Sequence, residues 1–131
     1  MIMDVESLRD FCLSLPLACE SFPFDDETLV FKVEGKIFLF IGLESVELRA
    51  NVKCDPDYAL ELRDAYSEVR PGYHMNKKYW NTIYITPSLK DSLVQEWVLH
   101  SYCEVVKKLN RTQREHIANL LREWKEMNGM L

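Results

Sequence analysis

Residues 70–81 combine the side chain types that most often contact phosphates and nucleobases. The segment holds cations, amides, an imidazole and aromatic rings but no carboxylate, and these residues are Arg70, Tyr73, His74, Asn76, Lys77, Lys78, Tyr79, Trp80 and Asn81. Cations bind phosphate, amides and imidazole donate to phosphate or base edges, and aromatic rings stack on bases. The segment therefore favours a site for nucleic acid or another polyanion. The alternative is a structural corner, with Trp80 and Tyr73 in the core and the lysines only solvated.

Two further stretches extend this basic patch in the sequence. Residues 47–53 alternate as a half-buried strand does, which places Arg49, Asn51 and Lys53 on one face. If helices leave that face uncovered, it adds two cations and an amide to the same surface. Lys36 lies beside a predicted hairpin turn, where a wing tip would be. We therefore include Arg49, Lys53 and Lys36 among the predicted polyanion-binding residues.

The charge distribution permits such a surface on an acidic chain. The 131 residues contain 16 Lys and Arg against 21 Asp and Glu, which gives a formal charge of −5. A net acidic protein is repelled by nucleic acid at long range unless its charge is unevenly placed. Residues 69–114 contain eight bases and three acids, whereas residues 1–34 contain two bases and eight acids. The alternative is that these charges only solvate helix faces.

The sequence gives weak support for catalysis. His74 has the pKa range of a general base, but no serine, cysteine or aspartate is tied to it by spacing. His100 is expected on a helix surface or in a hydrogen-bonded core position. Asp25, Asp26 and Glu27 are consecutive, so we interpret them as a solvated turn and not as a metal site. No Walker loop, dinucleotide glycine pattern or H-E-x-x-H motif occurs, which favours a protein that is not an enzyme.

The four cysteines indicate free thiols. Cys12, Cys19, Cys54 and Cys103 show neither a C-x-x-C pair nor the spacing of a zinc site. Cys12 and Cys103 are expected to be buried as small hydrophobic side chains.

The first residues lack the features of a secretory signal, and no apolar stretch is long enough to span a bilayer. We predict a cytoplasmic protein with no membrane contact, no cofactor and no metal.

Hydrophobic periodicity predicts a helix, three or four strands, a helix, one or two strands, a long helix and a last helix. The predicted helices are residues 4–15, 55–66, 89–109 and 112–127, and the predicted strands are residues 18–22, 28–33, 36–41, 47–53 and 79–86. Glu34-Gly35 between two strand-like runs is typical of a hairpin, and Arg70-Pro71-Gly72 is predicted to be a turn. Helices on one face of a mainly antiparallel sheet bury each apolar stripe once, so we predict a two-layer α+β fold.

Capping signals mark the start of each predicted helix. Asp4 and Asp55 are predicted N-caps, and Pro56 follows the second of them at the first helical position. Ser88 is predicted to cap the long helix. Thr112-Gln113-Arg114-Glu115 is predicted to form a capping box for the last one.

Several motifs resemble the MmcQ/YjbR family in order and spacing. They are Phe22-Pro23-Phe24, Gly35-Lys36, Lys53-Cys54-Asp55-Pro56, the block from Pro71 to Thr82, and His100-Ser101-Tyr102. The pattern His74-x-Asn76-Lys77-x-x-Trp80-Asn81 is the most specific of them. The resemblance covers roughly residues 4–115 and does not include the final helix.

The resemblance implies an α-β-β-β-α-β-β-α layout that is similar to the secretion-chaperone-like fold. We accordingly predict an MmcQ/YjbR-like domain over residues 1–115 and a C-terminal helical extension, residues 116–131, packed on the same domain. The family has a proposed DNA-binding role through paired β wings. The resemblance therefore implies a DNA-binding protein that is not an enzyme.

Three functions stay open from the sequence. The first is DNA binding through a basic surface on the sheet side, with Lys77 and Lys78 at its centre. The second is a protein- or peptide-binding module like the secretion chaperones, or self-association through residues 117–127, with Ile117, Leu121 and Trp124 as the docking face. The third is a small-ligand or catalytic pocket near His74 and Trp80. We favour DNA binding because of the uneven charge.

Overall fold

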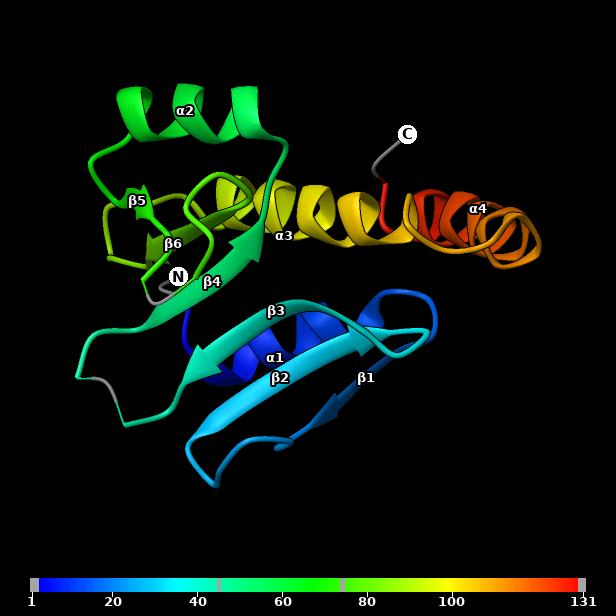
Figure 1. Cartoon of the computed structure of the whole chain (residues 1–131), viewed down its shortest axis with the longest axis horizontal. Helices are drawn as coiled ribbons and strands as arrows, with labels where there is room; N and C mark the ends of the chain where they lie inside the picture. The colour runs from blue at the N-terminus through cyan, green and yellow to red at the C-terminus, as the bar shows by residue number, and fades with distance from the viewer. Residues whose placement is uncertain (1–2, 45, 74, 130–131) are drawn as a thin grey trace.

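A computed structural model describes residues 3–44, 46–73 and 75–129. Within these ranges, six strands form one antiparallel sheet in the order β1-β2-β3-β4-β6-β5. The strands are β1 Ala18–Ser21, β2 Thr28–Val33, β3 Lys36–Gly42, β4 Arg49–Lys53, β5 Val69–Pro71 and β6 Trp80–Tyr84. The helices are α1 Val5–Ser14, α2 Pro56–Ala65, α3 Asp91–Val106 and α4 Arg111–Met127. Figure 1 shows this arrangement.

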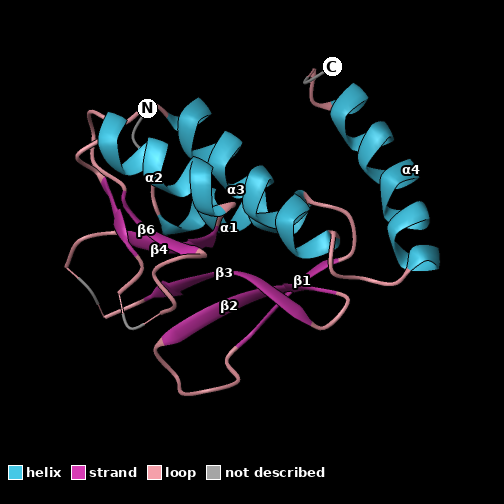
Figure 2. Ribbon diagram, turned by 45° about the horizontal axis from the view of Figure 1, so that its top comes forward, coloured by secondary structure: helices cyan, strands magenta, loops and turns pink. Residues whose placement is uncertain are grey.

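The helices α1, α2 and α3 lie on the same side of the sheet, whereas α4 stands at its edge (Figure 2). This confirms the predicted two-layer α+β fold with a mainly antiparallel sheet. The layout expected from the resemblance has three strands before the second helix, and the chain has four. The additional strand is β1, which pairs with β2 along its whole length, from Ala18 opposite Val33 to Ser21 opposite Val30.

Local chemistry sets two of the helix starts as predicted. The Asp4 carboxylate accepts the Ser7 amide at 2.8 Å, and the Ser7 hydroxyl accepts the Asp4 amide at 2.9 Å. These two bonds form a capping box at the start of α1. The Asp55 carboxylate accepts the Tyr58 amide at 3.2 Å, and Pro56 occupies the first turn of α2.

The other two predicted caps were wrong. Lys90 precedes α3, and the Ser88 hydroxyl instead lies 3.0 Å from the Thr86 hydroxyl. Asn110 caps α4 in a box with Gln113, so that helix begins before the predicted Thr112. Asparagine is a somewhat better N-cap than threonine, and Glu115 is held by Arg111 at 2.9 Å.

The β2-β3 hairpin turns at Glu34-Gly35 as predicted. Glu34 has a φ of 49° and Gly35 a φ of 78°, and a type I′ hairpin turn needs positive φ at both positions. The predicted turn at residues 70–72 was partly wrong, because Val69–Pro71 forms β5 and pairs with β6. Proline is tolerated there because β5 is an edge strand. No further strand among the described residues pairs with its outer side, so the amide proton that proline lacks is not needed for a hydrogen bond.

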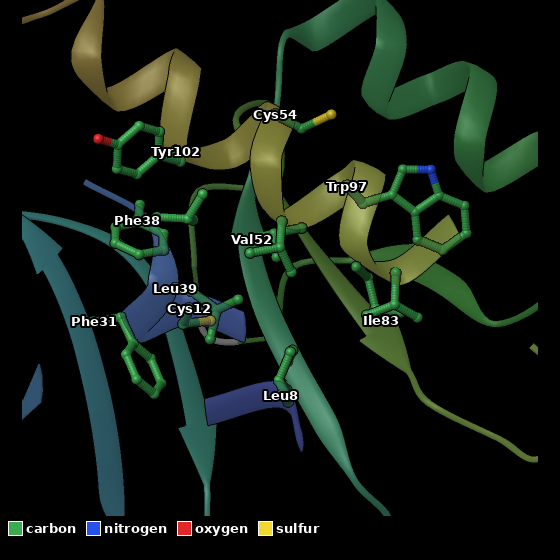
Figure 3. Close-up of a cluster of buried hydrophobic side chains, with 14 of the residues drawn as sticks. Leu8, Cys12, Phe31, Phe38, Leu39, Val52, Cys54, Ile83, Trp97 and Tyr102 are labelled. Carbon is green, nitrogen blue, oxygen red and sulfur yellow. The ribbon is translucent and has the colours of Figure 1, made fainter. Parts of the chain in front are cut away.

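The core lies between the sheet and the three helices. Figure 3 shows Leu8 and Cys12 from α1 and Trp97 and Tyr102 from α3 around the inward side chains of the central strands. The Phe38 and Tyr102 rings meet edge to face at 5.4 Å. Cys12 is fully buried as predicted, and burial raises the pKa of its thiol. Cys103 is half-buried.

Helix α4 packs on α1. The Trp124 ring meets the Phe11 ring at 5.8 Å, and its indole N–H donates to the Ser14 hydroxyl at 3.2 Å. Ile117 is 1% exposed. Two of the three side chains predicted as a docking face are thus buried inside this chain and cannot face a partner while α4 stays in place. The predicted boundary between residues 115 and 116 falls inside α4.

No membrane-crossing helix is found in the part of the chain that the structure describes.

Candidate nucleic-acid interface

The sheet surface opposite α1, α2 and α3 carries cations, polar groups and aromatic rings. Strands β4 and β6 pair with Arg49 opposite Tyr84, Asn51 opposite Thr82 and Lys53 opposite Trp80. Directly opposed residues share one face of an antiparallel sheet, and Phe40 and Arg70 join this face opposite Asn51 and Thr82. We call this surface the open face, and its residues are Phe40, Arg49, Asn51, Lys53, Arg70, Trp80, Thr82 and Tyr84. None of the described helices lies on it (Figure 2).

Two arginines on the open face are held by tyrosine rings. The Arg70 guanidinium lies 4.5 Å from the centre of the Tyr84 ring. The Arg49 guanidinium lies 5.9 Å from the Tyr84 ring and 5.8 Å from the Tyr73 ring. Stacking orients a guanidinium while leaving its N–H donors available. None of the salt bridges between described residues involves Arg49, Arg70 or Lys53.

A hollow of about 280 Å³ opens toward the end of this face at which Gly42 and Arg49 lie. Its lining consists of Thr28, Phe40, Gly42, Arg49, Asn51, Tyr73 and Thr82. The Thr82 hydroxyl accepts the Tyr73 amide at 3.0 Å and donates to Asn51 Oδ1 at 2.7 Å. This bond fixes the side chain amide of Asn51, whose NH2 group has no acceptor among the described residues. The hollow therefore combines aromatic walls, a polar floor and one guanidinium.

The 72–79 loop next to the open face is anchored from the helix side. Arg63 on α2 donates to the carbonyls of Lys77 and Trp80. The Gly72 amide donates to the Trp80 carbonyl at 2.9 Å, and a Cβ at Gly72 would lie 2.9 Å from Trp80 Cβ and from that oxygen. Glycine is thus required at this close approach of the two chain segments.

The two ends of the open face differ in charge. At the hollow end, Glu27 precedes Thr28 and shares a hydrogen bond with Glu44, and this bond raises the pKa of the Glu27 carboxyl. At the other end lie Lys53, opposite Trp80 at the start of β6, and the loop before β6 that carries Lys77 and Lys78. A polyanion on the open face is therefore attracted toward the lysine end.

Comparison with known proteins identifies the family. The YjbR family model matches residues 13–104. The chain belongs to the YjbR family.

Relatives support this over nearly the whole chain. The Escherichia coli O157:H7 protein named uncharacterized protein YbdF is 34% identical over 123 residues, which cover 88% of this chain and 98% of the relative. The Escherichia coli K12 protein named uncharacterized protein YjbR is 33% identical over 118 residues, which cover 90% of this chain and 100% of the relative.

Solved structures share the fold. A Deinococcus radiodurans protein with a DUF419 domain is 36% identical and superposes with a TM-score of 0.82 over 89% of each chain. A Pseudomonas syringae protein, 19% identical, superposes with a TM-score of 0.67 over 79% of this chain and 99% of its own. The second likeness concerns the fold alone.

In this YjbR chain, the predicted site residues separate into four groups. Arg49, Lys53, Arg70 and Trp80 share the open face. Lys77 and Lys78 are exposed but lie in the loop between β5 and β6, at the rim of the face and not at its predicted centre. The Lys77 ammonium donates to the Gly72 carbonyl at 3.3 Å, and the Lys78 ammonium lies 5.4 Å from the Tyr79 ring.

Two other predicted residues, Asn81 and Lys36, do not line the open face. Asn81 is 0% exposed and faces the helices, where it accepts from Arg63 Nε at 2.7 Å and donates to the Ala59 carbonyl at 3.3 Å. Its proposed contact with a polyanion is corrected to a structural role. Lys36 pairs with the core residue Val33, so the register directs it to the helix side.

Two predicted residues of the loop have other outcomes. Asn76 is exposed, and its side chain oxygen accepts the Lys78 amide at 3.0 Å, which is the contact of a turn residue. His74 lies outside the described residues, so the expectations of a ligand or a general base at this position stay predictions.

The sequence argument missed several residues of this surface. Phe40 and Thr28 line the hollow, and Lys32 pairs with Cys19 and Ile37 on the same side of the sheet. The signal was present, because the core residues Leu29, Phe31 and Val33 alternate with Thr28, Val30 and Lys32 along β2. The strand had been interpreted only as part of a hairpin.

Proposed function

We propose that this YjbR-family protein binds nucleic acid, with DNA as the first polymer to test, through the open face of its sheet. The observation that carries the proposal is the convergence of Arg49, Lys53 and Arg70 on one uncovered surface with no carboxylate partner among the described residues. Unpaired cations beside aromatic rings are the usual composition of a surface that follows a phosphate backbone.

The net charge of −5 sets limits on this binding. Long-range repulsion opposes approach, so affinity has to come from local contacts, and it should fall steeply with salt. If Arg49, Lys53, Arg70, Lys77 and Lys78 each contact one phosphate, the log–log salt slope is about −4.5 on duplex DNA and about −3.5 on a single strand.

Docking of another protein on α4 is less favoured because Ile117 and Trp124 are buried against the rest of the chain.

The test uses a fluorescein-labelled DNA hairpin with a single-stranded tail, which offers paired and unpaired DNA together. We expect a rise in anisotropy at about 50 mM salt, weakening toward about 200 mM with a slope in the range given above. Replacing both open-face arginines, Arg49→Gln with Arg70→Gln, should reduce the slope by about 1 per arginine.

The matched control removes two cations far from the open face. Lys108→Gln with Arg122→Gln changes the net charge by the same amount, and both side chains are exposed, one just after α3 and one on α4. Absence of binding to the tailed hairpin at about 50 mM salt overturns the proposal. An equal loss in the control pair overturns the assignment to the open face.

A further inference from the structure

We propose that the hollow in the open face holds one unstacked base, so that the protein's preferred ligand is a single-stranded nucleic acid and not a duplex. This inference rests on the proposed function and names the class of ligand. It is carried by the hollow's lining and by the width of the face around it.

The size of the hollow suits one flat ring system. Its volume of about 280 Å³ lies near the lower limit of about 300 Å³ for small-molecule pockets, so it holds one group of a polymer and not a longer segment. Phe40 and Tyr73 supply ring surface at its walls. Stacking on such rings is sequence-tolerant because every base has a π face.

The polar floor suits the edge of a base. Thr82 is 1% exposed, and its hydroxyl is already committed to the Asn51 carbonyl oxygen. The Asn51 amide is thereby turned so that its NH2 group remains to donate, and an acceptor on a base edge is the partner it lacks. The Arg49 guanidinium at the rim of the hollow is placed to bind the phosphate of the same nucleotide.

A duplex does not fit this arrangement. The strands β3, β4, β6 and β5 lie side by side across the open face, and three strand spacings of about 4.8 Å make it about 14 Å wide before side chains are added. That exceeds the roughly 12 Å of a major groove, which admits a helix or a two-stranded ribbon. Bases inside a duplex also have both ring faces covered, so their rings cannot reach Phe40 and Tyr73.

The charge gradient orients the strand. The Glu27 and Glu44 pair lies beyond the hollow end of the face, whereas Lys53 lies four residues along β4, about 13 Å from Arg49. The strand therefore leaves the hollow toward Lys53 and the loop with Lys77 and Lys78. This path accommodates a short run of a few nucleotides, as in other single-strand grooves, where site sizes start at about 4.

The test compares three labelled probes of equal length at about 100 mM salt: single-stranded DNA, single-stranded RNA and a blunt DNA duplex. We expect at least one single strand to bind about tenfold or more tightly than the duplex. The two single-stranded arms distinguish DNA from RNA, since both offer unstacked bases and phosphates.

Ring variants separate base stacking from phosphate contact. Tyr73→Ala should weaken the single-strand complex about 5- to 150-fold with an unchanged salt slope. Leu60→Ala, which removes an exposed apolar side chain on α2 away from the open face, is the control and should bind like the wild type. Arg49→Gln should instead reduce the single-strand salt slope by about 0.7. Circular dichroism checks that each variant is folded.

The possible failures differ. Equal affinity for the single strands and the blunt duplex, or an unchanged affinity in Tyr73→Ala, overturns the inference and leaves the proposed function in place. Failure of every probe to bind overturns both.

Discussion

The two faces of the sheet differ in composition although the same strands form both. One face is apolar and buried under the helices, and the other is polar, charged and covered by none of the described helices (Figure 2). Along β4, Ala50 and Val52 are 0% and 2% exposed and lie in the core under the helices, whereas their neighbours Arg49, Asn51 and Lys53 are half-buried on the open face. Alternation thus places the core side chains on one side of each strand and the charged and polar side chains on the other. Changes on the open face should alter binding far more than they alter folding.

Polar groups make the same contrast. On the covered face, the Ser101 hydroxyl accepts a hydrogen bond from the Lys53 amide at 2.7 Å and donates one to the Phe38 carbonyl. Its donor and an acceptor site are therefore both satisfied inside the protein. On the open face, Asn51 keeps two N–H donors without a described acceptor. A satisfied buried group stabilises the fold, and a group with unused donors has capacity left for a ligand.

The largest expected effect is the difference in stability between two alanine substitutions on β3, one at Phe38 on the covered face and one at Phe40 on the open face. Phe38→Ala should lower the free energy of unfolding by about 3–5 kcal/mol, because Phe38 is 0% exposed and packs on Tyr102. Phe40→Ala should cost about 1–2 kcal/mol, because Phe40 is half-buried on the open face. Urea unfolding followed by tryptophan fluorescence measures both, and equal losses would contradict the division between the faces.

A smaller effect is expected for two asparagines on neighbouring strands. Asn81→Ala should cost about 1–3 kcal/mol, because it leaves the Arg63 side chain and the Ala59 carbonyl without a buried partner. Asn51→Ala should cost about 0.5–1 kcal/mol, because it removes one hydrogen bond, from the Thr82 hydroxyl, that is only partly buried.

The same asparagine pair has a second readout. Binding of a single-stranded probe should weaken in Asn51→Ala and stay at the wild-type level in Asn81→Ala under conditions where both are folded. If the binding losses are reversed, the assignment of Asn51 to the ligand side is wrong.

The alternation of β4 and β6 was readable from the sequence, and so was the separation of Arg49, Asn51 and Lys53 from the core. That Asn81 lies on the opposite side of β6 from Trp80 followed from the same rule. The composition of residues 70–81 nevertheless grouped Asn81 with the predicted polyanion-binding residues. The error came from assuming that residues close in sequence lie on the same surface. In a strand, two consecutive side chains point to opposite faces of the sheet.

Other features depended on distant partners. The hollow needs Phe40 from β3, Thr82 from β6 and Tyr73 from the loop between β5 and β6, and no local pattern states that they meet. The start of α4 depended on competition between Asn110 and Thr112, whose capping preferences differ by little. The burial of Trp124 against Phe11 joins the two ends of the chain, so periodicity alone could suggest an apolar face but not what covers it.

The smallest expected effect concerns a titratable group on the covered side. His100 Nε2 accepts the Asp55 amide at 3.2 Å, and the ring packs at 4.7 Å against Tyr58. Burial lowers the pKa of His100 below its ordinary 6.5. As the pH falls below about 6.5, the unfolded chain therefore binds the proton first, and the free energy of unfolding decreases until the folded-state pKa is passed.

Urea unfolding at about pH 7.5 and about pH 5.5 measures this change. His100→Gln keeps an acceptor for the Asp55 amide but cannot be protonated, so its stability should decrease less over this interval than that of the wild type. His116→Gln removes an exposed imidazole on α4 and should follow the wild-type curve. An identical decrease in His100→Gln and the wild type would show that carboxylates, and not this half-buried imidazole, set the acid sensitivity of the covered face.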